Sequence, residues 1–120
     1  MSAQPKRILV AYDGSEAGVR ALDAAAQLVG YGSSLTVVHV SPDSNGNGPD
    51  ALAAARERLL GQQVTASYLA RAGEPAEEIV EAARELEADL VVVGRRTPPV
   101  PESVSAQVAR NAPSDVLVVR

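Results

Sequence analysis

Residues that could bind a ligand stand directly after an apolar segment near the start of this 120-residue chain. Asp13, Gly14 and Ser15 follow the run Ile8–Ala11. An aspartate at that place can hydrogen-bond a ribose or a base, or share a metal ion, and a glycine lets a ligand approach the backbone. The same residues also suit a plain turn into a helix, with Ser15 as its cap. Residue types alone favour this second, structural interpretation.

His39 is the only histidine of the chain and stands near the end of another apolar segment, Leu35–Val40. A histidine can act as a general base when a nucleophile and an orienting acid lie close to it. The sequence around His39 indicates neither of these partners. We therefore expect a local hydrogen bond at a strand end, and we assign no catalytic residue.

A third candidate is the segment 94–105, GRRTPPVPESVS, where an open α/β domain often keeps a phosphate-binding loop. Such a loop works because backbone N–H groups point at the anion and glycine lets them come close. Pro98, Pro99 and Pro101 have no N–H to offer. Glu102 would place a carboxylate near the phosphate, where like charges repel. The segment is therefore predicted to have lost the usual phosphate site.

Two features of the same segment keep an anion site open as an alternative. Arg95 and Arg96 follow the apolar run, and guanidinium groups can clamp a phosphate without any glycine. Ser103 and Ser105 begin a predicted helix whose N-terminus attracts anions. We favour the simpler interpretation, in which the arginines are solvated charges near acids and Ser103 only caps its helix.

Short segments rich in β-branched residues alternate with alanine-rich segments of helical spacing. Several of the short segments are apolar on both faces, as in a parallel sheet that helices cover on both sides. The predicted strands are Ile8–Ala11, Leu35–Val40, Val64–Leu69, Leu90–Val93 and Val116–Val119. Helices are predicted around the stripes Leu22–Val29 and Ile79–Leu86, from an Asp50 N-cap to about Gly61, and from Ser103 to Ala112.

The alternation of strands and helices predicts one doubly wound α/β domain over residues 1–120, with right-handed crossovers. Pro75 suits the first turn of the third helix. The turn-rich stretch 41–49, SPDSNGNGP, is expected to be a loop, and its glycines are too poorly placed for a dinucleotide fingerprint.

Composition excludes several classes of protein. The chain has no cysteine, which removes disulfides, thiolate metal sites and cysteine nucleophiles. Its net charge is −4 and its only aromatic residues are three tyrosines, whereas nucleic-acid binding needs a basic footprint and usually stacking rings. No apolar run approaches ~18 residues. We therefore expect no nucleic acid, no membrane and no metal site, and a cytoplasmic location.

Motifs along most of the chain together resemble the universal stress protein family. They are ILVAYDGS at 8–15, VVHV at 37–40, GEPAEEI at 73–79, ADLVVVG at 88–94, SVS at 103–105 and APSDVLVV at 112–119. The resemblance implies an adenine nucleotide alpha hydrolase-like fold, a single three-layer domain with a five-stranded parallel sheet of order 3-2-1-4-5. It also implies a stress-responsive regulatory protein, in a family where some members bind ATP and others do not.

The resemblance fails at the phosphate loop. ATP-binding members resemble G-x-x-G-x₉-G-[S/T] after the fourth strand, and here Gly94 matches while Thr97 and Glu102 replace the later glycines. Ser103 follows Gly94 by nine positions instead of fourteen, so the loop is five residues short. We therefore expect a regulatory module, not an enzyme, that does not bind ATP in the family's usual way.

The alternative is an adenine-nucleotide sensor or slow ATPase that binds ATP or ADP with Mg²⁺ through a modified phosphate site. Its cofactor-binding residues would be Asp13, Gly14, Ser15, Val40, Gly94, Arg95, Ser103 and Ser105. The resemblance also implies a homodimer through the last strand, with Val116, Leu117, Val118 and Val119 at the interface. An exposed strand edge favours such pairing because its unpaired N–H and C=O groups need partners. A further, unidentified protein partner is expected.

Overall fold

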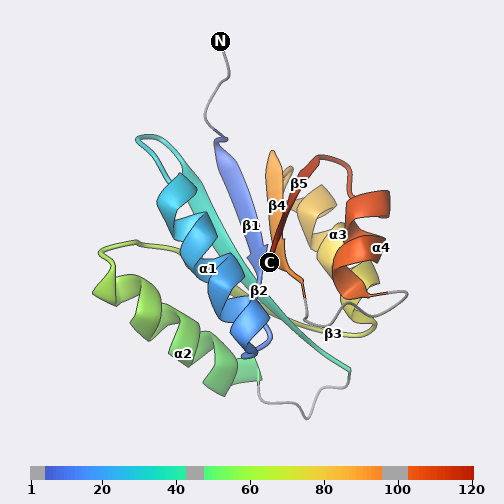
Figure 1. The fold of residues 1–120 in the computed structure, drawn as a ribbon, viewed down its shortest axis with the longest axis horizontal. Coiled ribbons are helices and arrows are strands. Elements are labelled where there is room, and N and C mark those ends of the chain that lie inside the picture. The colour runs from blue at the N-terminus through green and yellow to red at the C-terminus, as the bar shows by residue number, and fades with distance from the viewer. Residues whose placement is uncertain (1–4, 43–47, 96–102) are drawn as a thin grey trace.

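The strands of the chain form one parallel sheet with helices between them (Figure 1). The computed structural model describes residues 5–42, 48–95 and 103–120. In chain order its elements are β1 (Arg7–Ala11), α1 (Glu16–Leu28), β2 (Ser34–Ser41), α2 (Gly48–Gly61), β3 (Ser67–Ala72), α3 (Pro75–Glu85), β4 (Leu90–Gly94), α4 (Val104–Asn111) and β5 (Asp115–Val119). The strand order is β3-β2-β1-β4-β5, which confirms the predicted doubly wound α/β fold.

Helices cover both faces of the sheet, so the domain has three layers (Figure 1). Neighbouring residues of a strand point to opposite faces, and β1 therefore feeds two buried clusters. Ile8 and Val10 pack with Leu22 of α1 in one cluster, and Leu9 packs with Ile79 of α3 in the other. Strands buried on both faces must be apolar throughout, which is why they stand out in the sequence.

The third strand begins later than predicted. The sequence predicted Val64–Leu69, whereas β3 spans Ser67–Ala72. Gln63 takes the left-handed conformation with φ 62°, and the N–H of Val64 then donates to the Leu59 carbonyl at 2.9 Å. This bond and the one from the Gln63 N–H to the Leu60 carbonyl end α2 in a Schellman motif. Val64 then packs against the core beside the helix end. In the sequence, an apolar residue that packs against a helix end looks the same as one that begins a strand.

The start of α2 is also displaced from its prediction. The helix begins at Gly48, so Asp50 lies in its first turn and is not the N-cap. The loop predicted over 41–49 is shorter at both ends, because Ser41 closes β2 and Pro49 belongs to α2. Residues 43–47 lie outside the described residues. The predicted cap at Ser103 is confirmed, since its hydroxyl accepts the N–H of Ala106.

The order of the strands reverses at β1, with β2 and β3 on one side and β4 and β5 on the other (Figure 1). Chain connections leave in opposite directions at such a point and open a crevice outside the carboxyl ends of the strands. The fold therefore places the residues that follow β1, β2 and β4 around one crevice.

At the opposite, amino-terminal end of the sheet, a carboxylate fixes the entry into β1. The backbone N–H groups of Arg7 and Lys6 each donate to Oδ2 of Asp89 at 2.8 Å. These two hydrogen bonds hold the pKa of Asp89 below its ordinary value. Since the folded pKa is lowered, this contribution to stability is present above the ordinary pKa of an aspartate and is lost as the pH falls through the lowered value.

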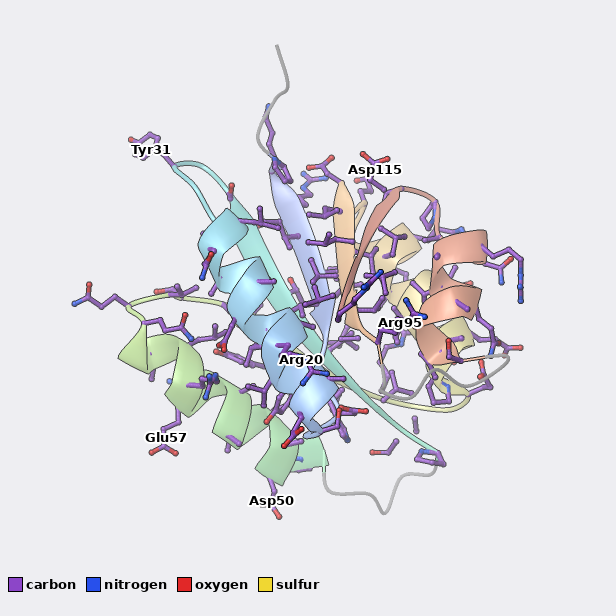
Figure 2. All side chains as sticks on the ribbon, viewed as in Figure 1. Arg20, Tyr31, Asp50, Glu57, Arg95 and Asp115 are labelled. Carbon is purple, nitrogen blue, oxygen red and sulfur yellow. The ribbon has the colours of Figure 1, made fainter. Side chains whose placement is uncertain are left out.

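Replacing Asp89 by asparagine is expected to lower the free energy of unfolding at neutral pH, because an amide oxygen accepts these bonds more weakly than a carboxylate does. The difference from the wild type should shrink at about pH 3, below the ordinary pKa of an aspartate, because the carboxylate of the unfolded chain then binds a proton. Urea unfolding at both pH values measures the effect. Glu57→Gln is the control, since Glu57 is exposed on α2 and points away from the molecule (Figure 2). A deficit of equal size at both pH values would contradict this assignment.

Candidate functional site

A cavity of about 460 Å³ lies at the carboxyl end of the sheet. The first turns of α1 and α4, the start of α3, and the ends of β1, β2 and β4 contribute to its wall. Its volume lies in the range of small-molecule pockets, and its place is where doubly wound sheets bind their ligands.

Most of the predicted site residues come together here. The cavity is lined by Asp13, Ser15, Val40, Gly94, Ser103 and Ser105, whereas the other two predicted residues, Gly14 and Arg95, are not part of its lining. Gly14 supplies the turn, with φ 86°. Arg95 follows β4 and donates its backbone N–H to the Val119 carbonyl at 2.7 Å. A binding role for the eight residues stays a prediction.

The turn between β1 and α1 is built by its own side chains. Oδ1 of Asp13 accepts the backbone N–H of Ser15 at 3.0 Å and the Ser15 hydroxyl at 2.5 Å. The same hydroxyl oxygen accepts the N–H of Gly18 at 3.1 Å and so caps α1, as predicted. Hydrogen bonds of its own side chains therefore hold the turn, and they place the Asp13 carboxyl group at the cavity wall.

Two glycines are required by close packing at this wall. A Cβ on Gly94 would overlap the carbonyl of Ala17, and a Cβ on Gly18 would lie 2.7 Å from Oδ1 of Asp13. Gly94 is therefore needed for the approach of α1 to β4, whether or not a phosphate binds. Gly18 was missed by the sequence reasoning, although a glycine within a helix costs stability and usually marks a packing constraint.

The N-terminus of α4 forms the other polar part of the wall. The Ser103 hydroxyl accepts the N–H of Ala106 at 3.2 Å and lies 3.3 Å from the hydroxyl of Ser105, which is buried. Both serines line the cavity. The positive end of the helix dipole favours a negative group at this place.

The described wall of the cavity carries little charge. Among its described residues, Asp13 is the only ionisable side chain besides the tyrosine Tyr12, and none is a lysine, arginine or histidine. The apolar part of the wall includes Val38, Val40 and Ile79. Within 5–42, 48–95 and 103–120, no group of three or more histidine, aspartate or glutamate side chains could hold a metal ion.

The predictions for Arg96, Thr97, the three prolines and Glu102 fall on residues 96–102, outside the described part of the chain. His39 does not line the cavity. Its Nδ1 lies 2.9 Å from the carbonyl oxygen of Tyr12, which confirms the predicted local hydrogen bond. None of the helices in the described part of the chain is long and apolar enough to span a membrane.

The model of the universal stress protein family matches residues 5–120. The chain belongs to this family. Comparison with curated protein sequences gives no match. The family assignment was thus correctly predicted from the motifs, and the fold around the cavity is the one that the family shares.

Solved structures of universal stress proteins show the same fold. One, in complex with cAMP, is 30% identical with a TM-score of 0.88 and covers 98% of each chain. One from Archaeoglobus fulgidus is 26% identical with a TM-score of 0.80 and covers 96% of this chain and 98% of its own. A family protein from Arabidopsis thaliana with AMP bound is 18% identical with a TM-score of 0.77 over 96% of this chain and 91% of its own, a likeness of fold alone.

Replacing Gly94 by alanine tests the packing role of this glycine. The new Cβ would meet the Ala17 carbonyl, so we expect a loss of about 1–3 kcal/mol in the free energy of unfolding. Gly61→Ala at the end of α2 is the matched control, because nothing lies within 4 Å of its added Cβ. Urea unfolding compares the two variants. Equal stability of both variants would show that Gly94 is not held by this contact.

Proposed function

We propose that this universal stress protein is a regulatory module that binds an adenine mononucleotide in the cavity at the carboxyl end of its sheet. The observation that carries the proposal is the cavity itself, at the point where the strand order reverses. The 30% identical relative in complex with cAMP supports an adenine nucleotide as the ligand. The proposal assigns no catalytic residue.

The described wall fits the parts of such a ligand. Val38, Val40 and Ile79 offer an apolar surface to a base. The Asp13 carboxylate can accept hydrogen bonds from a ribose or a base. The hydroxyl groups of Ser103 and Ser105, at the positive end of α4, can donate to a phosphate.

The charge of the wall favours a ligand with few negative charges. A cyclic phosphodiester carries one charge, whereas a phosphate monoester carries about 1.5 to 2 and ATP carries more. The described lining supplies one carboxylate and no basic side chain to balance those charges. Together with the proline-rich, glycine-poor sequence of segment 94–105, this favours a cyclic mononucleotide over ATP or ADP with Mg²⁺.

Calorimetric titration of nucleotide-stripped protein tests the ligand class. We expect saturable binding of cAMP at about micromolar dissociation constants, weaker binding of AMP, and the weakest binding of ATP with Mg²⁺. The untreated protein is first checked for co-purified nucleotide. No heat with any of the three and no bound nucleotide would refute the proposal, while tightest binding of ATP would refute the argument from charge.

The same titration on Asp13→Asn tests the contact to the nucleoside. An asparagine can keep the turn through its side-chain oxygen, but it accepts hydrogen bonds less strongly, so we expect about tenfold weaker cAMP binding. Glu57→Gln, on the outer surface of α2, serves as the control. Unchanged affinity of the Asp13 variant would remove this residue from the site.

A second proposal concerns the edge strand β5, which pairs with β4 on one side only. Leu117 in its middle is 38% exposed. We propose that β5 pairs with a second copy of the chain through Val116–Val119, because such pairing satisfies backbone groups and covers an apolar side chain. The further protein partner and the cytoplasmic location stay predictions.

Replacing Leu117 by lysine is expected to convert the dimer to a monomer, because a buried lysine at the edge opposes pairing. Leu60→Lys is the matched control, since Leu60 is 56% exposed on α2, away from β5. Light scattering gives the mass of each protein in solution. A monomeric wild type, or the same mass for both variants and the wild type, would refute the dimer.

A further inference from the structure

The carbonyl group of Tyr12 marks the point where β1 leaves the sheet. The N–H of this residue still donates to the Val38 carbonyl of β2 at 2.9 Å, as in a parallel ladder. Its carbonyl oxygen accepts a hydrogen bond from the His39 side chain, with 2.9 Å to Nδ1. A side chain thus makes the last link between β1 and β2, just before the turn that carries Asp13.

The protonation of the His39 ring follows from this partner. A carbonyl oxygen can only accept a hydrogen bond, so Nδ1 must carry a proton. His39 is 9% exposed, and a Cβ added to Gly48, at the start of α2, would lie 3.5 Å from Cδ2 of its ring. Val38 and Val40, on either side of His39 in β2, point to the cavity face. His39 therefore stands behind the cavity wall.

The peptide between Tyr12 and Asp13 also packs against α1. A Cβ on Gly18 would lie 3.2 Å from the backbone nitrogen of Asp13, so the bare backbone of Gly18 packs directly against this peptide. His39 fixes the carbonyl end of the peptide and Gly18 bounds the nitrogen end. Both contacts act on the peptide from which the Asp13 side chain leaves the backbone.

We propose that His39 is a positioning residue of the cavity, which orients the Tyr12–Asp13 peptide and through it the ligand-facing carboxyl group of Asp13. The ligand part of this inference rests on the proposed function, whereas the orientation of the peptide does not. His39 acts without touching the ligand. Its role is to supply a buried N–H donor to a carbonyl that the sheet no longer serves.

Two variants of nearly the same shape isolate the donor. His39→Leu keeps a side chain that branches at Cγ but has no N–H group, whereas His39→Asn keeps the branch and places an N–H donor near the position of Nδ1. Asp89→Asn is the control for general destabilisation, because it removes a carboxylate at the opposite end of the sheet.

The first measurement uses protein without ligand. In ¹H–¹⁵N spectra, His39→Leu should displace the amide resonances of Asp13, Gly14 and Ser15, while His39→Asn should leave them close to the wild type. The wild-type ring can be observed without ambiguity, since the chain has a single histidine. Its Nδ1 should be protonated in tag-free protein. Unmoved turn resonances in His39→Leu, or an unprotonated Nδ1, would overturn the inference whether or not a nucleotide binds.

The second measurement is the affinity for cAMP. We expect about tenfold weaker cAMP binding for His39→Leu. His39→Asn and the control Asp89→Asn should both bind cAMP within about twofold of the wild-type affinity. Equal loss in all three variants would show that the effect is general destabilisation, and wild-type affinity in His39→Leu would refute a positioning role. Failure of the wild type to bind any nucleotide would refute the proposed function, and the ligand-free spectra would still decide the orientation of the peptide.

Discussion

The first turn of α1 packs directly on the backbone of β4, and this contact determines where the cavity can form. The two elements approach so closely that Gly94 has no room for a Cβ beside the carbonyl of Ala17. Because α1 is drawn against β4, the turn that precedes it must cross the carboxyl end of the sheet at the point of strand reversal. The cavity wall is thus a consequence of helix packing before it is a binding surface.

The structural and the binding interpretations of Asp13 are compatible, because the hydrogen bonds that build the turn also hold its carboxyl group in place. Its Oδ1 holds the Ser15 amide and hydroxyl, and the Ser15 oxygen caps α1. A carboxyl group fixed in this way loses little conformational freedom when a ligand binds, so less of the binding free energy is spent on ordering it. Residue types favoured a plain turn, and the geometry shows that a plain turn can also preorganise a site.

The sequence predicted the fold well because each strand of a doubly covered parallel sheet must be apolar on both faces. The caps at Ser15 and Ser103 and the proline at the start of α3 were equally readable, since each is a local signal. The start of β3 could not be predicted in this way. Val64 belongs to the end of α2, where its N–H bonds to the Leu59 carbonyl, and the periodicity of the sequence does not contain that bond. The cavity depends on contacts between distant elements, such as Gly18 against Asp13, and no local pattern contains them.

If the cavity binds a nucleotide as proposed, the distribution of its polar groups decides which end of the ligand is selected. In the proposed binding mode, the described wall would offer a phosphate two hydroxyl groups and one helix N-terminus, and the sequence of segment 94–105 contains three prolines, which have no N–H to donate. The protein would then discriminate between nucleotides by disfavouring those with more negative charge, and not by making additional contacts to the preferred one. In the same proposed binding mode, the nucleoside would meet the Asp13 carboxyl group, and the His39 ring bonds to the carbonyl of the preceding residue, Tyr12. Under this proposal, discrimination among bases and riboses would depend on the β1–α1 turn, whose orientation comes from the same hydrogen bonds that complete the fold.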